Sequence, residues 1–419
     1  MKKPTNLVLV ILIVIASVAC SWTRFEAVKG VIKPGDKIGE MIVEQSTEVP
    51  YQQIWQFCEF MPNELEPFST TTECEVPSVF YLDIDIGWIA KESKISSNWD
   101  AITWELYIDG YKIDLGVFEW FEHEYLVKGE NNVSRNWVIT LKNLTPGKHN
   151  LRYLWTSGVA VDDGFNIYQP GTYEQTVNFT ILEKTVYPVF SSEVKIGQHL
   201  YTSEKAMLDF LLYLPDDYGK EPQQKWPLLV YLHGAPLRGA TLELLIDQEP
   251  FPKKLEKENN FPFIAVSPLG DGEYEFWAKD EMIDPLFTLL EEIQAEYPID
   301  EKRVYLTGND MGGNGVWAIG LRYPEYFAAL APVAGYYGWP PKVPENICDL
   351  KDVPVWAFHG GRDDIIPVEA EQGLVDALNA CGGDAKFSVS REMKIDVLYK
   401  VYADPELYEW LLSQKRLNR

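Results

Sequence analysis

Histidine is scarce in this sequence: 419 residues hold only five, at positions 123, 149, 199, 233 and 359. No two of them lie within one helical turn of each other, and no Cys-x-x-Cys pair is present. Because the spacings typical of metal ligands are missing, we predict neither a metal site nor a cofactor. The shortage also restricts hydrolytic chemistry, since imidazole is the most frequent general base in enzymes.

Basic side chains are also few: 37 lysine and arginine residues stand against 63 aspartate and glutamate residues, a formal net charge of -26. So acidic a surface repels phosphate groups, which argues against nucleic acid as a partner and against direct binding to an anionic bilayer. Apolar residues make up 46% of the chain. This content and the length are sufficient for two hydrophobic cores, and we expect two domains.

Long hydrophobic runs are missing as well. The apolar run from Leu7 to Ala19 is shorter than the roughly 20 residues of a membrane-spanning helix, and it follows Lys2 and Lys3. This arrangement is typical of a signal peptide, here residues 1–20. The run ends in Ser17-Val18-Ala19-Cys20, which resembles a bacterial lipobox, in which the cysteine becomes the lipidated N-terminus.

Ser17 is not the usual aliphatic residue of a lipobox, so plain secretion and an uncleaved anchor are the alternatives to lipidation at Cys20. All of them place the body of the protein outside the cytoplasm, and lipidation would anchor it to the membrane or the cell surface. Four further cysteines then form an even number, which is compatible with two disulfides in an exported chain. Pairing within each domain, Cys58–Cys74 and Cys348–Cys381, is the simplest of three connectivities; buried free thiols are the alternative.

The first half of the chain is predicted to be mainly β structure. Residues 21–77 are rich in turn residues and are predicted to be irregular, whereas residues 78–185 contain alternating apolar and polar positions between short turns. This pattern predicts an immunoglobulin-type β-sandwich. Phe118-Glu119-Trp120-Phe121 is an aromatic cluster that favours a strand with rings in the core over a platform for stacking sugars.

From about residue 190 to 419 the spacing of the apolar residues changes. Short apolar strands alternate with helical stretches such as 282–296 and 369–379, which predicts an α/β fold with a mostly parallel sheet and helices on both faces. The segment from Asp404 to Leu412 has an aspartate before a proline and then apolar residues at helical spacing, which predicts a capped terminal helix.

Three motifs in this half carry a resemblance. Arg303 to Gly313 contains Gly308-Asn309-Asp310-Met311-Gly312, a strand, a sharp turn between glycines and a helix start that resembles the G-x-S-x-G nucleophile elbow. Val230 to Gly234 resembles the strand and His-Gly turn that precede an oxyanion donor. Pro354 to Pro367 resembles the strand and loop of the catalytic acid, with Asp363 at the acid position.

With this order and spacing, the chain from about residue 195 onward resembles the esterase branch of the α/β-hydrolase superfamily, related to polyhydroxybutyrate depolymerases, feruloyl esterases and dienelactone-hydrolase-like proteins. The resemblance implies backbone oxyanion donors at Met311 and Ala235. It also implies a cleft near the elbow, lined by residues that include His233, Gly234, Tyr274 and Trp277.

Two of the three catalytic positions depart from the family. Asp310 stands where the family has serine, and Ile395 stands where it has histidine. No histidine follows Asp363 in the chain, and His233 and His359 belong to their own strand ends, where structural roles are expected. Serine-type ester cleavage needs both the hydroxyl nucleophile and the imidazole, so this chemistry is predicted to be lost.

Asp310 is also a poor replacement nucleophile. Attack of a carboxylate on an ester gives an anhydride, and hydrolysis of an alkyl-enzyme ester would again need an imidazole to activate water. Because Asp310 precedes a helix N-terminus, which favours a carboxylate, we expect it to occupy the N–H donors of Met311 and Ala235. Asp310 and Asp363 alone are too few ligands to predict a bridging cation.

The sequence therefore predicts an exported pseudoenzyme with an esterase-like α/β-hydrolase domain. Its expected partner is a small molecule, a carbohydrate ester or a polymer ester in the cleft, or another protein. One alternative is an active carboxylic-ester hydrolase with an unconventional site or with a histidine supplied by the β domain. Another is a structural module of the cell envelope in which side chains fill the cleft.

Overall fold

The computed structural model describes residues 28–46, 52–60, 64–127, 130–191, 193–258, 260–270 and 277–416. The predicted signal region with Cys20 and the predicted cleft residue Tyr274 lie outside these ranges. Among the helices of the described ranges, none combines the length and the apolar character of a membrane span. The same ranges contain no group of three or more histidine, cysteine or acidic side chains that could hold a metal ion.

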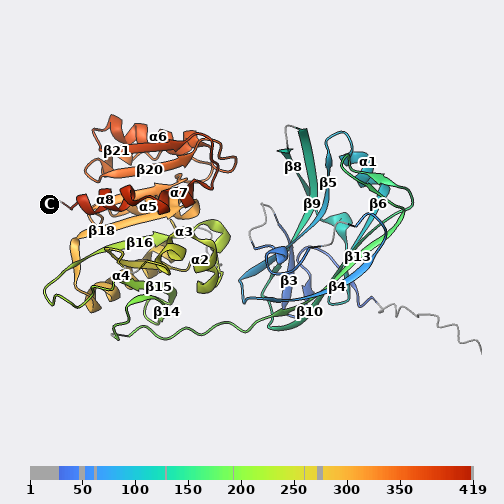
Figure 1. Ribbon diagram of the computed structural model, residues 1–419, viewed down its shortest axis with the longest axis horizontal. Helices are drawn as coiled ribbons and strands as arrows, with labels where there is room; N and C mark the ends of the chain where they lie inside the picture. Colours follow the sequence, from blue (N-terminus) through green and yellow to red (C-terminus); the bar gives the residue numbers. More distant parts are fainter. Residues whose placement is uncertain are drawn as a thin grey trace, which may run out of the picture.

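The chain forms an N-terminal β unit and a C-terminal α/β domain, joined by an extended segment (Figure 1). The β unit has two large sheets, whose apolar side chains form its core, and a small sheet of β11 (Val161–Asp162) and β12 (Ile167–Tyr168). The first sheet has the order β1-β7-β6-β10-β13-β4: Val31–Ile32, Tyr111–Ile113, Ile102–Ile108, Gly147–Ser157, Gly171–Ile181 and Ser69–Val76. The second has the order β2-β3-β9-β5, with β8 also paired to β9: Lys37–Ile38, Met41–Gln45, Glu130–Lys142, Tyr81–Lys91 and Trp120–Val127.

The prediction of an irregular region over residues 21–77 is wrong for its described part. Four strands, β1 to β4, lie there and join both sheets, so the β unit begins near Val31. The strands were hidden because β1 and β2 have only two residues each and β4 reads Ser-Thr-Thr-Thr-Glu-Cys-Glu-Val. At the edge of its sheet, β4 buries little apolar surface and therefore shows no alternating pattern.

The aromatic cluster at 118–121 divides between the core and the surface. Phe118 is buried but lies between the 3-10 turn Leu115–Val117 and β8, whereas Trp120, the first residue of β8, is 43% exposed. The Arg135 guanidinium lies 4.2 Å from the Trp120 ring centroid and donates to Glu122. One face of this ring is therefore in contact with a cation rather than with the core.

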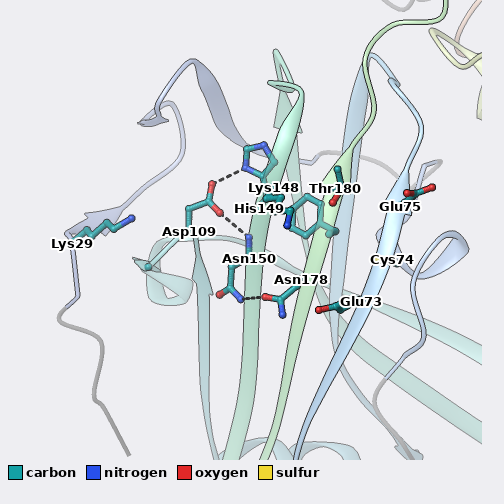
Figure 2. A pocket seen from close by; sticks show the side chains of 12 residues that line it. Lys29, Glu73, Cys74, Glu75, Asp109, Lys148, His149, Asn150, Asn178 and Thr180 are labelled. Carbon is teal, nitrogen blue, oxygen red and sulfur yellow. Dashed lines mark hydrogen bonds and ion pairs between the residues drawn. The ribbon is translucent and has the colours of Figure 1, made fainter.

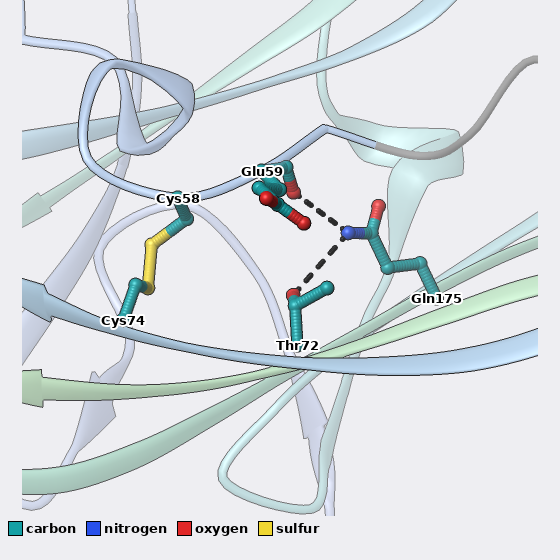
Figure 3. The surroundings of a disulfide bond; sticks show 5 residues. All are labelled: Cys58, Glu59, Thr72, Cys74 and Gln175. Carbon is teal, nitrogen blue, oxygen red and sulfur yellow. Dashed lines mark hydrogen bonds between the residues drawn. A yellow bond between two sulfur atoms is a disulfide. The ribbon is translucent and has the colours of Figure 1, made fainter.

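Both predicted disulfides are confirmed. Cys58–Cys74 ties the segment after the 3-10 turn Ile54–Gln56 to β4, and Cys348–Cys381 ties the loop before β20 to the helix α6 (Val368–Ala380). Figure 3 shows the first bridge beside Gln175, whose amide donates to the Glu59 carbonyl over 2.7 Å. Each bridge closes a loop inside one domain, as the simplest connectivity requires.

A polar pocket on the β unit is built around His149, near the start of β10 (Figure 2). His149 Nδ1 lies 2.8 Å from Asp109 Oδ2, and Nε2 lies 2.7 Å from the Thr145 carbonyl oxygen. Both partners accept hydrogen bonds, so they favour the doubly protonated ring, and the Asp109 carboxylate raises the pKa of His149. His149 therefore connects the turn at Asp109 with the turn at Thr145 and has a structural role.

The α/β domain contains a sheet of eight strands in the order β14-β15-β17-β16-β18-β19-β20-β21. β15 is antiparallel to both of its neighbours, and the other pairs are parallel. In this order the strands are Gly197–Ser203, Leu208–Leu214, Ile264–Pro268, Trp226–Leu232, Ile299–Asn309, Ala329–Val333, Val355–Gly360 and Ala385–Ser390.

Helices pack on both faces of this sheet, as the alternating pattern predicts. Helices α4 (Asp280–Glu296), α5 (Met311–Arg322) and α6 contribute to one core cluster. Helices α3 (Pro250–Leu255), α7 (Val397–Ala403) and α8 (Pro405–Ser413) contribute to the cluster on the opposite face. The Asp404 side chain caps α8 by accepting from the Glu406 N–H over 3.0 Å, which confirms the predicted terminal helix.

Candidate functional site

The turn between β18 and α5 has the geometry of a nucleophile elbow. Asp310 stands at its centre with φ 54° and ψ -115°, in the left-handed region that ordinary side chains avoid. Both flanking glycines are required by close backbone contacts: a Cβ at Gly312 would lie 2.0 Å from the Leu232 carbonyl oxygen, and one at Gly308 would lie 2.7 Å from the same atom. The turn is thus strained and tightly packed, as the motif predicts.

The Asp310 carboxylate occupies the backbone donors next to the elbow. Its Oδ2 accepts from the Ala235 N–H over 2.9 Å, and the Met311 N–H acts to lower the pKa of the same carboxyl. Ala235 begins a short 3-10 turn, Ala235–Leu237, directly after β16. These are the two N–H groups that the family resemblance marks as oxyanion donors, and the contact is the one expected for a carboxylate at this position.

Charge and burial act on Asp310 in opposite directions. Burial raises the pKa of this carboxyl above its usual range, and the nearby Asp363 carboxylate adds to the rise. The two backbone N–H groups and the positive charge of Arg238 act to lower the same pKa, but they do not cancel the effect of burial. The ionised form of Asp310 is therefore disfavoured in the folded protein relative to the unfolded chain.

The Asp310→Asn variant is expected to be more stable than the natural chain at pH 7. Folding raises the pKa of the Asp310 carboxyl, so the native state binds its proton more tightly than the unfolded chain does. The ionised group therefore destabilises the folded protein fully at pH values above the folded-state pKa. This destabilisation disappears at pH values below the ordinary pKa of 3.8. Asparagine keeps an acceptor oxygen for Ala235. We expect the melting temperature of the α/β domain to rise by about 2–4 °C, which corresponds to about 1 kcal/mol.

Thermal unfolding at pH 7 and at pH 4 measures this effect. The gain at pH 7 must shrink at pH 4, where aspartate in the unfolded chain also binds its proton. Asp364→Asn, on an exposed side chain of the same loop as Asp363, is the matched control and leaves the difference between the two pH values unchanged. A loss of stability at pH 7 in Asp310→Asn contradicts the assignment of a destabilising carboxylate.

Asp363 lies on the loop after β20, at the position predicted for the acid. Its side chain is fully buried, and Oδ1 accepts from the N–H groups of Ile365 and Ile366, each over 2.9 Å. Among the described residues, Oδ2 has no hydrogen-bond partner, and the His359 Nε2 atom lies 3.8 Å from it. The loop therefore holds the carboxylate in place while one of its oxygens remains without a donor.

Ile395 lies in the turn before α7, beside the loop of the acid. The Arg362 N–H donates to the Met393 carbonyl over 2.9 Å, and the Lys394 carbonyl passes so close to Gly360 that a Cβ there would lie 2.1 Å from it. The segment thus has the place that the alignment of motifs assigns to the histidine loop. The Ile395 side chain packs against the core cluster of α3, α7 and α8 and offers no proton acceptor.

His233 has a structural role at the end of β16. Its Nδ1 lies 2.8 Å from the Gly234 carbonyl oxygen, and its Nε2 accepts from the Gly270 N–H over 2.8 Å. Complete burial lowers the pKa of His233 to about 4, so the ring is neutral at physiological pH. The Trp277 indole N–H donates to the His233 carbonyl over 3.0 Å. Trp277, which was predicted to line the cleft, is thus buried in the core.

His359 belongs to a buried ion pair below the acid loop. Its Nδ1 lies 2.7 Å from Glu371 Oε2, its Nε2 lies 2.9 Å from the Ile366 carbonyl oxygen, and both side chains are fully buried. Glu371 also accepts from the Trp317 indole N–H over 3.1 Å. The Glu371 carboxylate raises the pKa of His359 despite its burial. Sequence reasoning did not find Glu371, because a glutamate in the first turn of a helix is usually solvated.

A second buried carboxylate, Glu249, was also missed. It accepts from the Tyr231 hydroxyl over 2.5 Å and from the Gly234 N–H over 3.0 Å, while Tyr231 also lies 2.5 Å from Asn309 Oδ1. Burial raises the pKa of Glu249. This network supports the turn before Ala235 and the residue before Asp310. The one available signal was Pro250, which marks Glu249 as the residue before a helix.

The three other histidines lie elsewhere in the fold. His123 is on β8 and His149 is in the turn pocket of the β unit. His199 is on β14, and three strands separate β14 from the elbow strand β18. The structure therefore brings Asp310, Ala235, Met311 and Asp363 together, with Ile395 beside the acid loop, and it places no imidazole between Asp310 and Asp363 among the described residues.

Comparison with known proteins finds similarity to esterases and related hydrolases in this half of the chain. Residues 274–392 match the model of the dienelactone hydrolase family, a segment that contains the elbow and the acid loop. A bifunctional acetylxylan esterase/xylanase of Neocallimastix patriciarum is 27% identical over 156 residues, which cover 36% of this chain and 21% of that protein. A Yersinia pestis relative is 31% identical over 97 residues. The chain thus spans about a fifth and about a third of these two relatives (21% and 36%).

Solved structures similar to this chain are esterases and related hydrolases. A thermostable esterase has 20% identity and a TM-score of 0.42, with coverage of 83% of this chain and 99% of that one. A ferulic acid esterase has 18% identity and a TM-score of 0.41, with coverage of 52% and 96%. An S-formylglutathione hydrolase from Agrobacterium tumefaciens has 16% identity and a TM-score of 0.40, with coverage of 55% and 99%. At these identities and TM-scores, no argument rests on the likeness.

Proposed function

We propose that this chain is an exported protein, anchored through a lipid at Cys20, whose esterase-like cleft binds its ligand without cleaving esters. The observation that carries the proposal is the hydrogen bond from the Ala235 N–H to the Asp310 carboxyl, next to the Met311 N–H. In an esterase, such donors must be open to the oxygen of the substrate carbonyl, where negative charge develops. A carboxyl oxygen already in that place occupies the Ala235 donor, so a substrate oxygen cannot accept from it.

The missing imidazole supports the same proposal. The acid loop presents Asp363 with one unpartnered oxygen, and the neighbouring segment carries Ile395. Without a base, no group in the described site removes a proton from a nucleophile or from water. The scaffold of an esterase therefore persists around positions that no longer carry the chemistry.

Export has support from the two disulfides, which form and persist in oxidising compartments. The proposal for Cys20 rests on the lipobox-like sequence alone, and secretion without lipid is its alternative. We also propose that the β unit is an immunoglobulin-type sandwich. Two sheets that share one apolar core support this assignment.

A carbohydrate ester is the ligand class that we propose for the cleft. The relative from Neocallimastix patriciarum acts, by its name, on acetylxylan and xylan. In this chain, the loop after β19 carries Trp339, whose side chain is 65% exposed and suited to stacking against a sugar ring. Asn314 on helix α5 donates to the Tyr336 carbonyl over 3.2 Å and so fastens this loop next to the elbow.

Calorimetric titration with acetylated xylo-oligosaccharides tests the proposal. We expect binding without release of acetate, and we expect Trp339→Ala to weaken it at least about tenfold, the scale of a lost stacking contact. Met207→Ala is the matched control, because Met207 is also an exposed apolar side chain but lies in the turn between β14 and β15. Release of acetate by the chain contradicts the non-catalytic assignment, and absence of binding contradicts the ligand class.

A further inference from the structure

The short turn that carries the Ala235 N–H is held from two sides. On the side of the α/β domain, Ala235 donates to Asp310, and the Gly239 N–H donates to the Gly270 carbonyl over 3.0 Å. The turn itself is a single 3-10 turn of three residues, Ala235–Leu237. So short an element has few internal hydrogen bonds of its own, and its position depends on what surrounds it.

On the other side, the turn is held by the β unit. The Gln52 amide Nε2 donates to the Arg238 carbonyl over 3.0 Å and to the Pro236 carbonyl over 3.3 Å. The Phe80 N–H donates to the Gly239 carbonyl over 2.9 Å. Three carbonyl oxygens between positions 236 and 239 therefore accept from residues that precede them by more than 150 positions in the sequence.

Gln52 is itself firmly placed in the β unit. Its side chain and backbone are only 2% exposed, and its carbonyl accepts from the Asp83 N–H on β5 over 2.8 Å. Leu244, on helix α2 (Leu242–Gln248), packs against the core cluster of the β unit and adds an apolar contact to the same interface. The donor is thus fixed by a sheet, whereas its acceptors lie on a turn.

We propose that Gln52 is a positioning residue of the cleft, through which the β unit holds the turn that presents the Ala235 N–H to the elbow residue. The same bonds hold the backbone of Arg238, whose positive charge acts on the Asp310 carboxyl. The β unit therefore serves as part of the site as well as a neighbouring domain. The position of the turn relative to Gln52 is independent of the proposed function. The expected effect of Gln52 on catalysis rests on the proposed function, because it assumes an esterase scaffold.

Hydrogen exchange of the full-length chain tests the geometric part. Gln52→Met keeps the length of the side chain and removes the donor, so the amides between residues 235 and 240, of which Pro236 has none, are expected to exchange about tenfold faster, the scale of one or two lost hydrogen bonds. Gln175→Met is the matched control: Gln175 is also buried and also donates to a backbone carbonyl, but to Glu59 within the β unit (Figure 3).

The control separates a local effect from general loss of stability. Gln175→Met is expected to speed exchange around residues 58–60 and to leave residues 235–240 unchanged. Unchanged exchange at 235–240 in a folded Gln52→Met protein overturns the inference. Equal acceleration of 235–240 by both variants also overturns it, because the turn would then respond to the stability of the β unit and not to Gln52.

A kinetic experiment tests the consequence in the background in which Asp310 is replaced by serine and Ile395 by histidine. There Gln52→Met is expected to lower kcat by about 10- to 100-fold with little change in KM, as for an oxyanion donor moved out of place. Gln175→Met leaves both constants unchanged. An unchanged kcat in Gln52→Met overturns the inference. A background that is itself inactive contradicts only the view, within the proposed function, that an esterase scaffold persists around the lost catalytic groups, and the exchange experiment then decides.

Discussion

The double variant Asp310→Ser/Ile395→His is expected to hydrolyse short-chain p-nitrophenyl esters at least about 10³-fold faster than the natural chain. Serine at the elbow supplies the hydroxyl and frees the Ala235 and Met311 N–H groups for the substrate oxyanion. Histidine at 395 enters the segment beside the acid loop, where Asp363 Oδ2 has no hydrogen-bond partner among the described residues. An imidazole N–H donated to that oxygen would orient the ring as a base.

The single variants define what each replacement contributes. Asp310→Ser alone opens the donors but has no base, and Ile395→His alone has a base but no hydroxyl, so both are expected to stay near the background rate. Adding Asp363→Asn to the double variant must remove most of its activity, since the ring then loses its orienting carboxylate. A folded double variant with no activity contradicts the view that only the chemistry was lost from an esterase scaffold.

Removal of the buried Glu371 carboxylate is expected to have the largest effect on stability. Glu371→Leu leaves the His359 ring and the Trp317 indole N–H buried without their shared acceptor. Breaking a buried pair from one side costs about 3–5 kcal/mol. The melting temperature of the α/β domain is therefore expected to fall by about 6–20 °C in thermal unfolding at pH 7.

The combined variant His359→Phe/Glu371→Leu is the control for this result. Replacing both partners by apolar side chains removes the unpaired groups, and much of the lost stability is expected to return. Glu369→Leu, on the exposed side of the same first helical turn, should shift the melting temperature little. A Glu371→Leu protein as stable as the natural chain contradicts the assignment of a buried ion pair below the acid loop.

The sequence predicts the site well where backbone geometry demands particular residues. Gly308 and Gly312 identify the elbow because no Cβ fits beside the Leu232 carbonyl, and this steric requirement is visible as a motif. The order of strands and helices follows from the same half of the chain, whose apolar strands are buried on both faces of the sheet. The two disulfides follow from an even count and from pairing within domains.

Contacts between distant segments are what the sequence did not predict. Gln52 meets the turn at 236–238 only because two domains pack together, and no local pattern marks it. Glu249 and Glu371 resemble ordinary surface glutamates in the sequence, yet the fold buries them against Tyr231 and His359. Strand β4 has no alternating pattern because its residues are mostly polar on both faces. These features depend on tertiary packing, which propensity does not encode.

The most direct test of the central claim is the rate of ester hydrolysis by the natural chain, from Ser21 onward, followed by acetate release and by intact mass for any acyl adduct. We predict neither turnover of acetyl and feruloyl esters nor an adduct, because Asp310 occupies the Ala235 donor and no imidazole lies between Asp310 and Asp363 among the described residues. Turnover that is abolished in Asp310→Asn or Asp363→Asn would contradict the account and would identify the two carboxylates as the working groups of an unconventional hydrolase.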